Sequence, residues 1–231
     1  MNTLSRISRH SPVASAVQQL LHYPRLPIVM EELQAMLEAE REKRERFYDE
    51  MKEEQKVEFI NGEVIVHSPV KLRHSLISQN LFTVLSIYVR QHELGLVGHE
   101  KWLITLTRND YEPDIVYFGP EKAQTLTPDQ TRFPAPDLVI EVLSPSTESK
   151  DRGIKFRDYA AHGVTEYWIV DPDEEMIEQY ILKDEAYHLR VKTNTGVVRS
   201  TAIEGLAVPV RAAFDEAEKL AAVRAMLADE S

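Results

Sequence analysis

One carboxylate stands in the middle of an apolar segment of this chain. Glu141 follows Leu138–Ile140 and precedes Val142 and Leu143. Such a run is typical of a strand buried on both faces, where an unpaired carboxylate would be costly to desolvate. We therefore expect Glu141 to have a partner, which could be a cation, a basic side chain or a proton of its own.

Two aspartates are candidates to share a site with Glu141. Asp137 lies on the same face of the strand 137–144, but four residues of extended chain place it about 13 Å away, too far to share one ion. Asp114 opens the strand 113–118. If these two strands pair antiparallel, Asp114 lies beside Glu141 with Cβ atoms about 5 Å apart. The spacing thus favours Asp114 and Glu141 as the pair.

Two adjacent carboxylates, with carbonyl and water oxygens, form a hard-oxygen site that suits Mg²⁺ or Mn²⁺. Next to a phosphate, such an ion polarises the P–O bond and activates water. The alternative is structural: one carboxylate caps the start of a strand and the other is ion-paired. The residues alone leave both interpretations open.

Phosphoryl transfer also needs a positive group near the developing charge. Leu143, two residues after Glu141 on the same face, cannot supply it. In the predicted helix 147–161, Lys155 lies about 40° from Tyr159 on the sheet-facing side, whereas Lys150 points about 180° away from Tyr159. Lys155 is therefore the candidate cation. Its alternative role is that of a surface lysine paired with a neighbouring aspartate.

The elements that must position these residues follow from hydrophobic periodicity and turn signals. Over residues 72–171 the order is helix, strand, strand, strand, helix, strand, which predicts a mixed α+β fold with a mixed central sheet flanked by helices. The expected helices are 31–56, 72–94, 147–161 and 211–228. The expected strands are 57–67 (a hairpin around Asn61-Gly62), 102–107, 113–118, 137–144, 166–171, 177–182 and 186–191.

Composition limits the classes of function. The 231 residues carry a net charge of −11, so nucleic-acid binding must rest on local positive charge or on metal ions. The absence of cysteine excludes disulfides and thiolate zinc sites and fits a reducing, cytoplasmic compartment. We find no apolar run long enough to span a membrane.

Several of these segments together resemble a known family. They are VEFINGEV (57–64), His74 at a helix start, EPDIVYF (112–118), APDLVIEVLSPST (135–147) with Asp151, Lys155 and Tyr159 after it, and GVTEYWIVDP (163–172). They are similar to the Uma-two-type restriction endonuclease family, a domain of unknown function within the PD-(D/E)XK nuclease superfamily.

This resemblance implies a restriction-endonuclease-like core over residues 30–210. It implies that Asp114 and Glu141 bind Mg²⁺ or Mn²⁺, and that the lysine missing at Leu143 has migrated to Lys155. The residues before 30 would form a poorly ordered N-terminal arm (1–29), and 211–231 a helical C-terminal tail.

Four further residues are secondary candidates for the site. Glu58 matches the acidic residue ahead of the family's Asn/Asp-Gly turn. The others are Asp137, His74 at the helix start and Tyr159.

Two functions remain open at this stage. The first is a Mg²⁺-dependent endonuclease that hydrolyses DNA, with a homodimer expected by analogy because cutting two strands needs two sites. The second is a non-catalytic protein that keeps the endonuclease-like fold as a binding or interaction module.

Overall fold

The computed structural model describes residues 12–52 and 55–228. The chain forms two compact units, Met1–Glu50 and Met51–Ser231, so the first unit extends beyond the boundary that we placed at residue 29. None of the described helices is both long and apolar enough to cross a membrane.

The first unit contains two helices, α1 (Pro12–Leu21) and α2 (Leu26–Glu50). Part of the predicted N-terminal arm is thus helical, while residues 1–11 lie outside the described part. The α2 helix begins five residues earlier than predicted, because Pro27 falls in its first turn, where a missing N–H costs nothing. It also ends at Glu50, short of the predicted residue 56.

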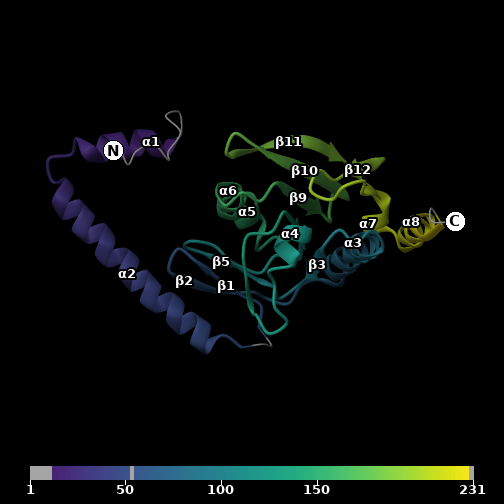
Figure 1. The fold of residues 1–231 in the computed structure, drawn as a ribbon, viewed down its shortest axis with the longest axis horizontal. Coiled ribbons are helices and arrows are strands. Elements are labelled where there is room, and N and C mark those ends of the chain that lie inside the picture. Colours follow the sequence, from purple (N-terminus) through teal and green to yellow (C-terminus); the bar gives the residue numbers. More distant parts are fainter. Residues whose placement is uncertain (1–11, 53–54, 229–231) are drawn as a thin grey trace. The chain divides into compact units, whose positions relative to one another are not determined.

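A six-stranded mixed sheet forms the centre of the second unit, in the order β11-β10-β9-β8-β6-β3 (Figure 1). Only β8 and β9 pair in parallel within it. Its strands are β3 (Leu96–His99), β6 (Ile115–Phe118), β8 (Leu138–Val142), β9 (Glu166–Asp171), β10 (Met176–Lys183) and β11 (Ala186–Thr193).

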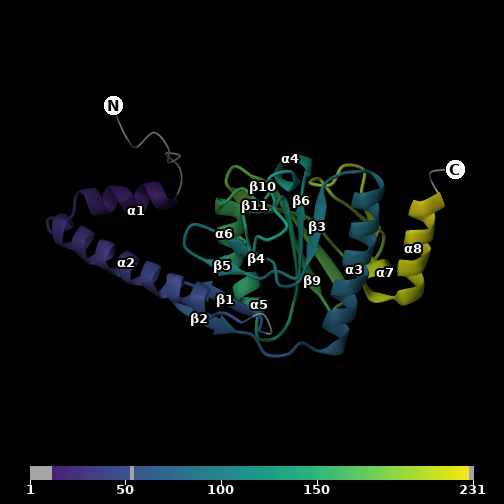
Figure 2. The ribbon, with the colours of Figure 1, turned by 60° about the horizontal axis from the view of Figure 1, so that its bottom comes forward.

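Helices cover both faces of this sheet, as predicted. Figure 2 shows α3 (Leu72–Gln91), α7 (Arg211–Phe214) and α8 (Glu216–Ala228) on one side, with α5 (Glu148–Asp151) and α6 (Ile154–Ala161) on the other. Alternate residues of β8 point to opposite sides: Ile140 packs in the α3 cluster and Val139 in the cluster that contains Tyr159 of α6. Glu141 therefore faces α6.

A second sheet, in the order β2-β1-β5-β4-β7, contributes to the α6 side. Its strands are β1 (Val57–Ile60), β2 (Glu63–Val66), β4 (Leu103–Thr105), β5 (Asp110–Tyr111) and β7 (Arg132–Phe133). A small hairpin of β12 (Val197–Arg199) and β13 (Ala207–Pro209), and the short helix α4 (Pro120–Ala123), complete the elements found among the described residues.

The prediction was wrong about one core strand. The segment 102–107 was expected as a strand of the central sheet, but β4 belongs to the second sheet, and β3 pairs with β6 instead. Gly95 and Gly98 lie just before and within β3, and because glycine is depleted in strands, the segment was not recognised as one. Gly98 is required there, because a Cβ would lie 2.5 Å from the ring of Trp102.

Two predicted helices are interrupted. The segment 147–161 divides at Gly153, which has φ −115° and ψ −96° and where a Cβ would lie 2.5 Å from the Ser149 carbonyl oxygen. The segment 211–228 divides at Asp215, which is extended. The α8 helix packs on α3 and places Ala222 in the core.

Candidate active site

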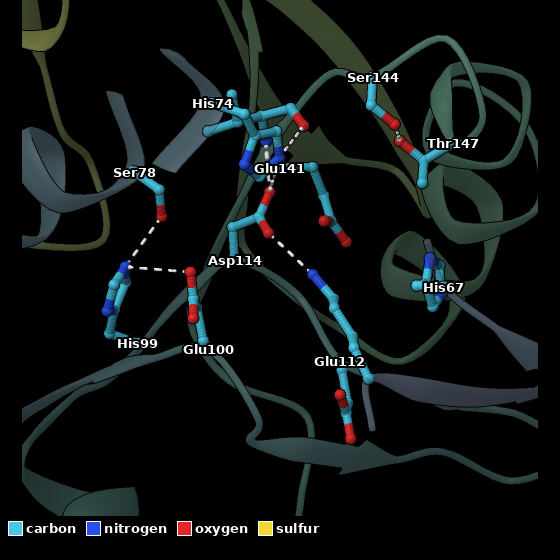
Figure 3. A network of polar contacts seen from close by, with 12 residues as sticks. His67, His74, Ser78, His99, Glu100, Glu112, Asp114, Glu141, Ser144 and Thr147 are labelled. Carbon is cyan, nitrogen blue, oxygen red and sulfur yellow. Dashed lines mark hydrogen bonds and ion pairs between the residues drawn. The ribbon is translucent and has the colours of Figure 1, made fainter. Parts of the chain in front are cut away.

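The strands β6 and β8 bring Asp114 and Glu141 together. They pair antiparallel, with Ile115 opposite Ile140, so the next pair in this register is Asp114 and Glu141. The carboxylate of Asp114 also accepts a hydrogen bond from the backbone N–H of Val142, at 2.8 Å from Oδ2. This confirms the strand pairing that we expected, and Figure 3 shows the two carboxylates beside each other.

Two side chains besides β8 hold Asp114 in its ionised form. Nζ of Lys56 lies 2.8 Å from its Oδ1. Nε2 of His74 lies 3.3 Å from its Oδ2 and donates to the Val142 carbonyl at 2.9 Å (Figure 3). Burial alone would raise the pKa of Asp114, but Lys56 and His74 hold this pKa below its ordinary value.

Glu141 is in the opposite electrostatic situation. Its Oε1 lies 3.1 Å from Nζ of Lys155 and accepts a hydrogen bond from the Tyr159 hydroxyl at 3.3 Å. Burial raises the pKa of Glu141 to about 8; Lys155 opposes that rise, while Asp151 and Asp114 add to it. An added cation at this carboxylate would therefore relieve an unfavourable charge.

Lys155 is buried and surrounded by carboxylates. Its Nζ lies 2.8 Å from Glu58, 3.1 Å from Glu141 and 3.1 Å from Asp151. The alternative was a surface lysine paired with Asp151 or Asp158. Lys155 does pair with Asp151, but it is buried and also pairs with Glu58 and Glu141. Burial lowers the pKa of Lys155, but the three carboxylates raise it well above its ordinary value.

The remaining sequence candidates divide into two groups. Glu58, His74 and Tyr159 contact members of the cluster. Asp137 does not: its carboxylate accepts from the Gly119 N–H at 2.8 Å and lies 2.8 Å from Nζ of Lys122, at the other end of β8.

The cluster lines one wall of a cleft of about 360 Å³. The lining residues come from the residue before β1, the segment after β2, the start of α3, the residue before β6, the end of β8 with the segment that follows it, α6 and the β9–β10 turn. They include Lys56, Arg73, His74, Asp114, Glu141, Lys155 and Asp173.

Sequence reasoning missed several members of this site. Lys56 and His67 both approach it, and Nε2 of His67 lies 2.9 Å from Oε2 of Glu58. A signal for Lys56 was available, because Lys56 and Glu58 are two residues apart in an extended segment and so share a face. No comparable signal marked His67, which depends on the pairing of β1 with β2.

The donor set suits a hard divalent cation. The described residues contain no group of three His, Asp or Glu side chains placed to hold a metal ion. Mg²⁺ does not require one, since it commonly binds one or two protein carboxylates and retains several waters. Asp114, Glu141 and the Val142 carbonyl offer such a set.

Comparisons with known proteins show a family and several relatives. A family model described as "Putative restriction endonuclease" (Uma2) matches residues 41–211. Two uncharacterized Synechocystis proteins are similar: slr1290 is 31% identical over 140 residues (59% of this chain, 71% of that protein), and sll1609 is 29% identical over 129 (54% and 72%).

A solved structure shares the fold. It is titled a "putative nuclease belonging to DUF820" from Anabaena variabilis, and it superposes with a TM-score of 0.63 at 21% identity. The match covers 73% of this chain and 94% of that one. The restriction-endonuclease-like fold expected from the sequence is thereby confirmed.

Proposed function

Because the chain belongs to the Uma2 family, described as "Putative restriction endonuclease", we propose that it is a nuclease that hydrolyses phosphodiester bonds of DNA with a divalent metal ion. The observation that carries this proposal is the pairing of Asp114 with Glu141 in the cleft. Family and fold support nuclease chemistry in general; the metal and the DNA substrate are the proposed part.

Asp114 and Glu141 would hold Mg²⁺ or Mn²⁺, with the Val142 carbonyl beside them. When bound, the ion supplies Lewis acidity, which polarises phosphate oxygens and favours deprotonation of water. The chain supplies the geometry. Val142 N–H fixes Asp114 against β8, while Lys155 and Tyr159 fix Oε1 of Glu141.

The positive charge of Lys155 offsets the negative charge that accumulates when several carboxylates share one site. This keeps the site compatible with an anionic substrate on an acidic chain. A homodimer would present two such sites to the two strands of a duplex.

One observation favours the second candidate, a non-catalytic binding module. The carboxylates of the site already have cationic partners: Lys56 at Asp114, and Lys155 at Glu141 and Glu58. Such a set of ion pairs is complete as a structural network and needs no metal ion to be stable.

Cleavage of supercoiled plasmid and of single-stranded DNA, with Mg²⁺, with Mn²⁺ and with EDTA, distinguishes the two functions. We expect nicked and linear products only with metal, and their loss in Glu141→Gln. Asp137→Asn is the matched control, because it removes a carboxylate of β8 outside the cluster, and it should cleave like the parent. A parent protein that cuts neither substrate with either ion would contradict the nuclease proposal and leave the binding module.

A further inference from the structure

We propose that Lys56, rather than Lys155, is the ammonium group that contacts the substrate phosphate in this site. The inference deepens the proposed nuclease function and rests on it. It assigns a substrate-binding role to a residue outside the Asp114–Glu141–Lys155 set.

Three buried ion pairs hold the ammonium group of Lys155 and keep it from a substrate. An ammonium group has three N–H donors, and three carboxylate oxygens lie within 3.1 Å of its Nζ. Its side chain is only 2% exposed. Contact with a phosphate would require breaking one of these buried ion pairs, which is costly because it leaves a buried carboxylate uncompensated. Lys155 is therefore a positioning residue for Glu141.

Lys56 has the opposite properties. Its side chain is 24% exposed and lines the cleft. Among the described residues its ammonium has one carboxylate partner, Oδ1 of Asp114 at 2.8 Å. Two of its three donors have no partner in the part of the chain that the structure describes, and they can serve a ligand that enters the cleft.

The backbone fixes Lys56 at this place. It immediately precedes β1, and its carbonyl accepts a hydrogen bond from the His67 N–H at 3.0 Å, which extends the β1–β2 pairing. A fixed cation aimed at a phosphate stabilises the charge that develops during its hydrolysis.

The salt dependence of DNA binding separates a phosphate contact from a structural role. Each phosphate neutralised by a cation adds about 0.9 to the slope of log affinity against log salt. We would measure this slope by fluorescence anisotropy on a labelled duplex without divalent metal, in a Glu141→Gln background that does not cleave. Adding Lys56→Ala should reduce the slope by about 0.9, and Lys56→Arg should restore most of it.

Lys122→Ala is the matched control. It removes a lysine–aspartate pair of the same length, 2.8 Å, at the opposite end of β6 and β8 and outside the cleft. We expect it to leave the slope unchanged. An unchanged slope in Lys56→Ala as well would overturn the inference, because Lys56 would then only orient Asp114.

Calorimetry with Mn²⁺ gives an independent readout on the otherwise unchanged chain. Lys56→Ala should bind Mn²⁺ at least as tightly as the parent, because a neighbouring positive charge has been removed. Loss of Mn²⁺ binding would assign Lys56 to positioning Asp114 and contradict the phosphate role. Failure of the nuclease proposal itself is visible separately, as a parent protein that cleaves no DNA.

Discussion

Nζ of Lys155, on α6, lies 2.8 Å from Oε1 of Glu58, on β1. The same ammonium also contacts Glu141, on β8. Since β1 and β8 belong to different sheets, one buried lysine links both sheets through the helix between them. The site therefore also stabilises the packing of the two sheets of the second unit.

The first prediction concerns the ion pairs of Lys155. Lys155→Ala leaves Glu58, Glu141 and Asp151 buried without their shared cation. Removing one partner of a buried ion pair typically costs about 3–5 kcal/mol of unfolding free energy. We expect a loss of that size in urea unfolding followed by circular dichroism.

Lys150→Ala is the control for this variant. Lys150 is half-buried on the neighbouring α5, and a surface change of this kind usually alters stability by less than about 0.5 kcal/mol. Equal stability of the two variants would mean that the carboxylates around Lys155 can neutralise themselves by taking up protons.

The second prediction concerns metal binding. Calorimetric titration of the parent with Mn²⁺ should show binding that Asp114→Asn or Glu141→Gln abolishes, because each removes one of two carboxylate ligands. Asp137→Asn should bind as the parent does, since Asp137 pairs with Lys122 outside the cluster. Binding that survives in both ligand variants would place the metal elsewhere.

The pairing of Asp114 with Glu141 could be predicted from the sequence, because it depends on the alternation of side chains along a strand and on the register of two paired strands. Two apolar strands with carboxylates at known positions leave few antiparallel pairings, and the observed one brings Asp114 to Glu141. Lys155 was accessible for a similar reason, since helical spacing relative to Tyr159 fixed its face.

What the sequence did not reveal depends on long-range packing. The β3 strand contains a glycine that only contact with Trp102 explains. His67 reaches the cluster because β2 pairs with β1, which forms a sheet with β5. No local pattern encodes how close that second sheet lies to Asp114.

The third prediction is a pH dependence of stability at Glu58. Burial would raise the pKa of this carboxyl, but Lys155 and His67 lower it from 4.5 to about 2. A lowered folded pKa stabilises the protein above pH 4.5, and this contribution is lost as the pH falls through about 2. Glu58→Gln should therefore lose about 3 kcal/mol of unfolding free energy at pH 7.

The difference in unfolding free energy between Glu58→Gln and the parent should become smaller as the pH falls below 4.5. Urea unfolding at pH 7, 5.5, 4 and 3 measures it. Glu63→Gln removes the same charge from an exposed position of the same hairpin and should change little at any pH. A deficit that is constant with pH would show that the side chain is needed for its shape rather than its charge.

The fourth prediction concerns an ion pair at the mouth of the cleft. Arg73, at the start of α3, pairs with Asp173 in the β9–β10 turn, and both residues line the cleft. Their side chains are 48% and 64% exposed, so the pair contributes little to stability. If DNA enters the cleft, its phosphates compete with Asp173 for Arg73.

Asp173→Asn should therefore tighten DNA binding severalfold at low salt, because it releases Arg73 and removes a negative charge from the path of a polyanion. Arg73→Ala should weaken binding, and both variants should unfold at urea concentrations close to that of the parent. Fluorescence anisotropy on one labelled duplex at several salt concentrations checks both changes. Because Asp173→Asn and Arg73→Ala break the same ion pair, opposite effects on affinity can arise only from the charge left in the cleft. Equal changes in DNA affinity in the two variants would mean that DNA does not pass this side of the site.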